Sequence, residues 1–173
     1  MEHERHPSLG VLGHLIQTGK IQSLPGVSLL MPPPDQDSIV REERVMGVVL
    51  PPFLKGLYRL CNGGAMGVVS LWSVPNATLP RGWLTLASGN SQLPSSVNRQ
   101  YLAFGTGDGG YIYAVDRASE EVYCLDKNTG YGAEFESGSL KQFFDVRIFG
   151  SQASSFGDDW VSDLIEAGCY VTP

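Results

Sequence analysis

A glycine-rich stretch beside a strongly β-forming segment is the feature that most constrains the fold of this chain. It lies within Tyr101–Asp116, where Gly105, Gly107 and Gly110 have the G-x-G-x-x-G spacing of dinucleotide-binding proteins. That fingerprint requires a helix to begin directly after the glycines, so that the helix N-terminus faces a pyrophosphate. Here the glycines are followed by Tyr111–Val115, whose aromatic and β-branched residues favour a strand. The stretch therefore predicts a β-hairpin and not a cofactor site.

The rest of the pattern predicts helices first, then consecutive strands, and a final helix. The expected helices run from a cap at Ser8 to Gly19, from Gln36 to Met46 behind a cap at Asp35 or Asp37, from Pro52 to an end at Asn62–Gly64, and from a cap at Ser154 or Ser155 to Gly168. The expected strands are 66–74, 83–87, 101–104, 111–116 and 121–125, with a loop at 88–99. This order favours an α+β fold, with helices packed against a mainly antiparallel β-sheet.

Length and composition favour one globular domain. The chain has 173 residues, of which 42% are hydrophobic, enough for an ordinary core. We assign residues 1–34 to an N-terminal tail and short helix, and residues 35–173 to the main domain. No apolar run approaches the roughly 20 residues that span a bilayer. The first six residues are charged and lack the apolar region of a secretory signal.

Charge and cysteine content indicate the compartment and the kind of partner. Three widely separated cysteines favour neither a disulfide framework nor a zinc site, so a reduced, cytoplasmic protein is the simplest interpretation. The formal net charge of −6 repels nucleic-acid phosphates and would attract a basic protein. We therefore expect no nucleic-acid or membrane partner. Solubility alone is the alternative explanation of this charge.

The groups that could carry chemistry do not form a site in the sequence. All three histidines, His3, His6 and His14, lie near the N-terminus. Residues 126–130 resemble the start of a calcium loop, but its twelfth position is Ser137 and not the required Glu. We expect no catalytic residue, no cofactor and no metal. An undetected enzyme is the alternative, with a deep pocket lined either by carboxylates of shifted pKa or by a cysteine; the cysteine candidates are Cys61, Cys124 and Cys169.

Four blocks of residues resemble the SUKH superfamily, also called Smi/Knr-like domains. The resemblance covers roughly residues 35–167 and departs from the family pattern in the longer N-terminal segment and in an insertion between Trp72 and Tyr101. The blocks are Ile39, Glu43, Gly47 and Leu50-Pro51; Leu57-Tyr58 and Cys61-Asn62-Gly63-Gly64; Phe104-Gly105, Asp108-Gly109-Gly110, Tyr113 and Asp116; and Ala153-Ser154-Ser155-Phe156 with Trp160.

The resemblance implies an α+β binding domain without catalytic machinery. Many bacterial members resemble immunity proteins, which bind and neutralise a cognate toxin that competing cells deliver. The expected partner is then a protein toxin, such as a basic nuclease or a deaminase. Other members are regulatory modules, including a protein that engages the secretion channel and a fungal cell-wall signalling regulator. A regulatory or scaffold module of the Smi/Knr type, without a toxin partner, is therefore the alternative function.

The hairpin and the connection after it provide a candidate surface for this partner. Acidic residues gather there around tyrosines, and tyrosine is enriched at interface hot spots. The two-residue period of a strand places Tyr111 and Tyr113 on one face. The residues that we expect to contact a partner are Asp108, Tyr111, Tyr113, Asp116, Glu120 and Glu121.

Overall fold

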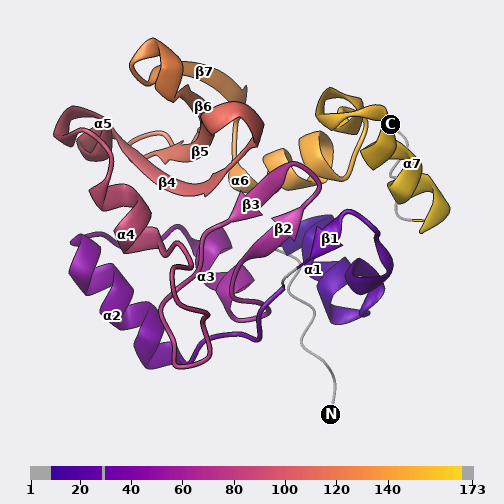
Figure 1. Ribbon diagram of the computed structural model, residues 1–173, viewed down its shortest axis with the longest axis horizontal. Coiled ribbons are helices and arrows are strands. Elements are labelled where there is room, and N and C mark those ends of the chain that lie inside the picture. Colours follow the sequence, from indigo (N-terminus) through magenta and orange to yellow (C-terminus); the bar gives the residue numbers. More distant parts are fainter. Residues whose placement is uncertain (1–8, 29, 169–173) are drawn as a thin grey trace.

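A single antiparallel sheet organises the computed structural model, which describes residues 9–28 and 30–168. Its seven strands follow one another in space in their chain order (Figure 1). They are β1 (Val27–Ser28), β2 (Gly64–Met66), β3 (Val69–Leu71), β4 (Tyr101–Thr106), β5 (Tyr111–Asp116), β6 (Val122–Asp126) and β7 (Gly132–Ser137). With helices around the sheet, the predicted α+β fold is confirmed.

Short helices surround the sheet. The α-helices are α1 (Gly10–Gln17), α2 (Gln36–Met46), α3 (Pro52–Tyr58), α4 (Leu86–Ser91), α5 (Ser95–Gln100), α6 (Leu140–Gln142) and α7 (Asp158–Glu166). The 3₁₀ turns are η2 (Lys20–Ser23), η3 (Asp108–Gly110), η4 (Lys127–Thr129) and η6 (Ala153–Phe156), and η5 (Phe143–Ile148) is a π-helix. None of the helices in the described parts of the chain is long and apolar enough to cross a bilayer.

The predicted hairpin is present, although β4 continues to Thr106, two residues beyond the expected end, and the second helix has the expected bounds. β4 and β5 pair antiparallel, and Gly109 and Gly110 adopt φ values of 69° and 88° in the turn between them. The residue after Gly110, Tyr111, therefore begins a strand and not a nucleotide-binding helix. In α2 the Asp35 carboxylate accepts a 2.6 Å hydrogen bond from the Ser38 N–H, and Gly47 ends the helix at φ 65°.

The sheet was predicted incorrectly between residues 66 and 99. The strand expected at 66–74 is divided into β2 and β3, because Gly67 turns the chain at φ 58°. The strand expected at 83–87 is absent from this described segment, which contributes only an isolated bridge between Ser73 and Thr85. Thr85 instead caps α4 in a reciprocal capping box with Ser88. The expected loop at 88–99 contains most of α4 and α5.

Two helix ends also differ from prediction. α3 ends at Tyr58, so Asn62 lies beyond the helix and is fully buried. At the other end of the chain, the expected caps Ser154 and Ser155 lie in η6, and no side chain caps α7. Ile165 of α7 is 59% exposed. The expected cap Ser8 lies outside the described residues.

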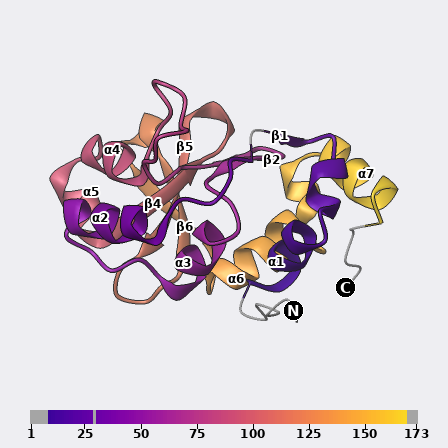
Figure 2. The ribbon, with the colours of Figure 1, turned by 90° about the horizontal axis from the view of Figure 1, so that it is seen from below.

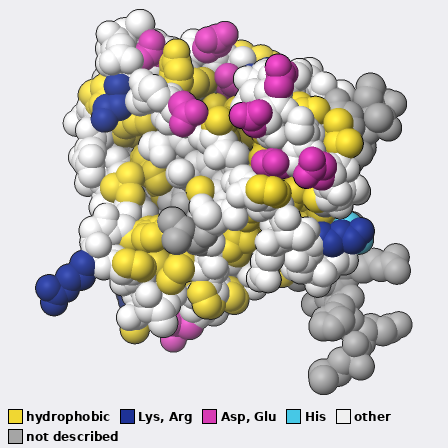
Figure 3. All heavy atoms as spheres, turned by 45° about the vertical axis from the view of Figure 1, so that its right-hand side comes forward, with side chains coloured by type: hydrophobic (Ala, Val, Ile, Leu, Met, Phe, Trp, Pro, Cys, Tyr) yellow, Lys and Arg dark blue, Asp and Glu magenta, His cyan; other side chains and the backbone are white. Residues whose placement is uncertain are grey.

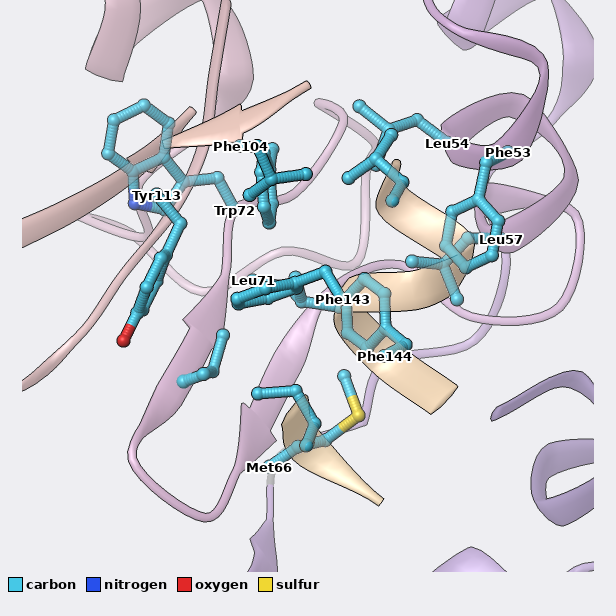
Figure 4. Packing of buried hydrophobic residues seen from close by; sticks show 14 of the residues in the cluster. Phe53, Leu54, Leu57, Met66, Leu71, Trp72, Phe104, Tyr113, Phe143 and Phe144 are labelled. Carbon is cyan, nitrogen blue, oxygen red and sulfur yellow. The ribbon is translucent and has the colours of Figure 1, made fainter. Parts of the chain in front are cut away.

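The main core lies between one face of the sheet and the helices α3 and η5 (Figure 4). The rings of Phe53 and Phe144 stack at 5.4 Å between these helices. From η5, Phe143 contacts the sheet residues Phe104 and Tyr113 at ring-centroid distances of 6.0 and 5.1 Å. Phe104 lies at a bulge in β4, where the pairing with β5 shifts between Ala103 and Gly105. Burial of this aromatic cluster holds the hairpin against the helices.

The described part of the N-terminal segment packs into the same core. Leu9 and Leu12 are fully buried, and β1 pairs with β2. Figure 2 shows α1 beside α6, near the start of η5. The Val11 N–H donates a 2.8 Å hydrogen bond to the Asp145 carboxylate, which joins the first helix to a segment 134 residues later. His14 on α1 is exposed.

Candidate partner-binding groove

The structure places five of the six predicted contact residues in two groups at opposite ends of β5. Asp108 and Tyr111 lie at the hairpin turn, and both are exposed. Asp116, Glu120 and Glu121 lie at the far end, around the connection to β6. Because a strand rises about 3.3 Å per residue, the two ends are roughly 16 Å apart. They do not form one compact site.

Tyr113 is not part of either surface. Only 7% of this residue is exposed, and its ring packs on Phe104, Phe143 and Phe156. Tyr111 shares its strand face but is 44% exposed, because it lies at the end of β5. Tyr113 is instead covered by Phe143 of η5 and Phe156 of η6.

A groove of about 400 Å³ lies beside the second group of residues. The junction between α2 and α3 forms one wall, and the ends of β4 and β5 with the following turn form the other. Its lining residues are Val48, Val49, Leu50, Pro51, Pro52, Leu102, Val115, Asp116, Arg117 and Glu120. Val49 is 79% exposed, so its aliphatic side chain is accessible to a partner.

Glu43 fixes the wall that carries Val49. Its Oε1 accepts a 2.7 Å hydrogen bond from the Leu50 N–H. The same oxygen forms an ion pair with the Lys55 ammonium at 2.8 Å. Burial opposes ionisation of this carboxyl, but Lys55 and the Leu50 N–H together lower its pKa below the ordinary value. The charged carboxylate therefore ties the end of α2, the connecting segment and α3 into one rigid edge.

The opposite wall carries the acidic groups. Asp116 accepts hydrogen bonds from the Ser119 and Ala118 N–H groups at 3.0 and 2.8 Å, and these bonds lower its pKa. Glu121 accepts a 2.9 Å hydrogen bond from the Tyr123 hydroxyl. Glu120 is exposed and adopts a left-handed conformation at φ 62°, which is rare for residues other than glycine. Hydrogen bonds thus hold the Asp116 and Glu121 carboxylates in place, and Asp116 and Glu120 line the groove.

Arg117 also lines the groove, but its guanidinium is engaged elsewhere. Its Nε donates to the Tyr101 carbonyl at 3.2 Å, and Nη2 donates to the Asn98 side chain at 3.0 Å. These bonds tie the guanidinium to α5 and the start of β4. The groove therefore has an apolar floor, and its rim carries two carboxylates, of Asp116 and Glu120, and one guanidinium, of Arg117.

The family of this chain follows from its sequence and agrees with this architecture. The SMI1 / KNR4 family (SUKH-1) matches residues 33–146, more than half of the chain. The chain belongs to the SUKH-1 family. The matched range includes both walls of the groove and the hairpin, whereas the fourth resembling block, 153–160, lies beyond it. No curated protein matches the chain in sequence.

The two described thiols of this SUKH-1 domain are buried side chains that contribute to packing. Cys61 and Cys124 are buried, at 3% and 8% exposure. Burial raises the pKa of each thiol to about 12, and near Cys124 the carboxylates of Glu136 and Glu134 add to the effect. A cysteine nucleophile needs a lowered pKa, so neither thiol is activated. Within the described residues, no group of three His, Cys, Asp or Glu side chains could hold a metal ion. Cys169 lies outside the described residues.

A second acidic region lies on the face that includes α7. In Figure 3, acidic side chains gather in the upper part of this face, and hydrophobic side chains are more numerous below them. Asp158, Asp159 and Asp163 line a hollow of about 530 Å³ beside Trp160. Asp158 and Asp159 occupy the first turn of α7, where the positive end of the helix dipole favours them. Helix stabilisation accounts for this pair.

The apolar half of the groove was missed in the sequence. None of the residues Val48, Val49 and Leu50 was among the predicted contact residues. A useful signal was present, because Val49 lies between a helix stop at Gly47 and the Pro51-Pro52 pair, where no regular element can bury it. Only the fold brings this segment against the end of β5, more than 60 residues later.

Proposed function

We propose that this protein is a non-enzymatic immunity protein of the SUKH-1 family, which neutralises a cognate bacterial toxin by direct binding in the cytoplasm. One observation carries the proposal: a rigid groove combines the highly exposed Val49 with the acidic rim of Asp116 and Glu120. We propose that a basic nuclease or deaminase inserts an apolar and cationic segment there, so that its active site is covered.

The two halves of the groove would contribute differently to binding. Complete burial of an aliphatic side chain such as Val49 stabilises a complex by about 1.5–3 kcal/mol. The rim charges would mainly increase the association rate constant, because complementary charge raises the rate of encounter. Added salt would reduce this effect by screening the charges. Since Asp116 and Glu121 are already held by hydrogen bonds, little side-chain entropy is lost when a partner binds.

The first experiment uses the toxin domain encoded by the gene adjacent to that of this protein. The domain is expressed in bacteria with and without this protein, and growth is measured. The purified proteins are then mixed, and their affinity is determined by calorimetry. We expect restored growth and a stable complex. Toxicity that persists in the presence of folded protein would contradict the proposal, and so would the absence of a toxin gene from the neighbourhood, which favours a regulatory module.

Matched variants test the groove itself. Val49→Arg and Glu120→Lys should each weaken the complex at least tenfold, whereas Val45→Arg and Glu166→Lys should leave it unchanged. Val45 is a suitable control because it is 74% exposed on α2 and does not line the groove, and Glu166 is an exposed acid on α7. Equal effects of the groove variants and their controls would place the interface elsewhere.

A further inference from the structure

One edge of the sheet is open to a further strand. The strand order places β1 at one edge and β7 at the other (Figure 1). β1 has only two residues, and so short a strand gives another chain little to pair with. β7 has six residues, and the four residues 132–135 are all exposed. No other segment in the described part of the chain forms a backbone hydrogen bond with these four residues outside their pairing with β6. Their outward N–H and C=O groups are therefore accessible to another chain.

A bulge sets the length of this open edge. The pairing of β6 with β7 shifts between Val122 and Tyr123, so that Glu136 of β7 has no partner residue on β6. The Glu136 carboxylate instead forms an ion pair with the Arg147 guanidinium of η5. Because a bulge interrupts the regular ladder of a strand, the part of the edge that can pair regularly is residues 132–135.

One face of the edge ends in an exposed aromatic ring. Tyr101 of β4 and Tyr123 of β6 lie 5.5 Å apart between ring centroids, and Tyr123 and Phe135 lie 5.8 Å apart. Exposure increases along this row, from 8% for Tyr101 to 56% for Phe135. A side chain on an added strand would pack against Phe135 as Phe135 packs against Tyr123. An aromatic or large aliphatic residue suits that position.

The opposite face of the edge carries a carboxylate without a cation. Successive residues of a strand point to opposite faces, so Glu134 lies on the other face from Phe135. Glu134 is exposed, and none of the ion pairs within the described residues involves it. Burial raises the pKa of the Cys124 thiol on this face, and three nearby carboxylates raise it further, those of Glu136, Glu134 and Asp126. Of these three, only Glu136 has an ion pair. A basic side chain on an added strand would therefore find unpaired negative charge here.

We propose that residues 132–135 pair with an extended segment of a second protein in which basic and apolar residues alternate. Its basic side chains would face Glu134, its apolar side chains would face Phe135, and its backbone would continue the sheet. A second copy of this chain fits the edge less well, because β7 contains two glutamates and no basic residue to place opposite Glu134. The interaction is separate from the proposed toxin binding, because none of the residues 132–135 lines the groove.

Nuclear magnetic resonance on the full chain labelled with ¹⁵N tests the proposal with synthetic peptides. The probe is acetyl-Lys-Val-Lys-Phe-Lys-Val-amide. One control peptide has Glu in place of each Lys, and another is methylated at every backbone nitrogen, so that it cannot pair as a strand. With the probe we expect saturable shifts of the amide signals of residues 132–135 and slower hydrogen exchange of the amides that point away from β6. Neither control peptide should produce these effects.

Matched variants test the charge on the edge. Glu134→Lys should weaken binding of the probe about tenfold and strengthen binding of the acidic control peptide, because the cross-strand charge pair is reversed. Glu120→Lys is the matched control: Glu120 is an exposed acid of the groove, so this variant should leave binding of the probe unchanged. The toxin complex is measured separately, so a failure of either proposal can be distinguished from a failure of the other.

Four results would overturn the inference. The signals of residues 132–135 could remain fixed as the probe is added. The methylated peptide could bind as well as the probe, which would mean that no strand is added. Glu134→Lys and Glu120→Lys could weaken binding equally, which would remove Glu134 from the interaction. Finally, analytical ultracentrifugation of the protein alone could show a dimer that dissociates in Phe135→Asp, which would assign the edge to a second copy. The spectra also report whether each variant is folded, so a loss of structure is not mistaken for a loss of binding.

Discussion

Replacing Asn62 by alanine should destabilise the fold more than most single substitutions. Asn62 is fully buried, and its side-chain amide makes two hydrogen bonds with the backbone of one residue, Val74. Its Nδ2 donates to the Val74 carbonyl at 2.8 Å, and its Oδ1 accepts from the Val74 N–H at 2.7 Å. Val74 is itself fully buried, so water cannot replace the lost partners without entering the core.

The magnitude follows from the two backbone groups that would be left unpaired. Each buried group without a partner costs about 1–3 kcal/mol, so Asn62→Ala should cost about 4 kcal/mol. That is a large fraction of the roughly 5–15 kcal/mol by which domains are stable. The matched control is Asn128→Ala: Asn128 is exposed, and its side chain makes only a 3.4 Å hydrogen bond to Gly109. This control should cost less than about 0.5 kcal/mol.

Guanidinium unfolding followed by circular dichroism measures both variants. We expect a lower midpoint for Asn62→Ala with an unchanged slope, since the surface exposed on unfolding stays similar. Asn62→Asp should be at least as destabilising at neutral pH, because it buries a carboxylate against the Val74 carbonyl. A cost below about 1 kcal/mol for Asn62→Ala would show that the Val74 groups find other partners, and the reasoning would be refuted.

Three further predictions follow from local geometry and burial. Gly63→Ala should cost more than about 2 kcal/mol in chemical unfolding, because Gly63 has φ 80° and a Cβ would lie 2.8 Å from the Leu71 carbonyl oxygen. Gly47→Ala, at φ 65° with nothing within 4 Å, should cost only about 1 kcal/mol; equal costs would contradict the steric argument. Glu120→Gly should raise stability by up to about 1 kcal/mol by relieving its left-handed conformation, yet weaken toxin binding in calorimetry; unchanged binding would remove this carboxylate from the interface. Glu42 is 3% exposed, and burial raises its pKa above the ordinary value of 4.5, although the Ala87 N–H opposes this shift. A raised carboxyl pKa means that the folded state holds the proton more tightly, so this group adds stability as the pH falls through its folded pKa toward 4.5. The stability advantage of Glu42→Gln at pH 7 should therefore shrink over that range; a constant difference between the two proteins would contradict it.

Part of the candidate site could be predicted from the sequence. Asp116, Glu120 and Glu121 were predicted as surface residues, and the structure places them around one end of β5 beside the groove. Their selection depended on acidic residues near tyrosines, a pattern that is local in the chain. The burial of Tyr113 could not be predicted in this way, because it depends on Phe143 and Phe156 from later helices.

The insertion between residues 73 and 100 was predicted least accurately. Its polar composition resembles a loop, but Asn90 is buried and is held by a distant strand. Its Nδ2 donates to the Ala103 carbonyl at 2.8 Å, and its Oδ1 accepts from the Ala103 N–H at 2.9 Å. Glu42 of α2 also accepts a 2.6 Å hydrogen bond from the Ala87 N–H at the start of α4. These contacts stabilise α4, a helix of six residues that would not persist alone.

The sequence alone determined the elements whose causes are local. Residues 105–110 specify a hairpin turn because glycine permits the positive φ values that it needs, and Asp35 and Gly47 bound α2 through contacts within a few residues. Tertiary structure alone decided which polar side chains are buried and hydrogen-bonded to the backbone of other segments, such as Asn62 and Asn90. It also decided which apolar side chains are exposed, such as Val49. The physical reason is that turn and cap energies depend on adjacent residues, whereas burial depends on segments that only the complete fold brings together.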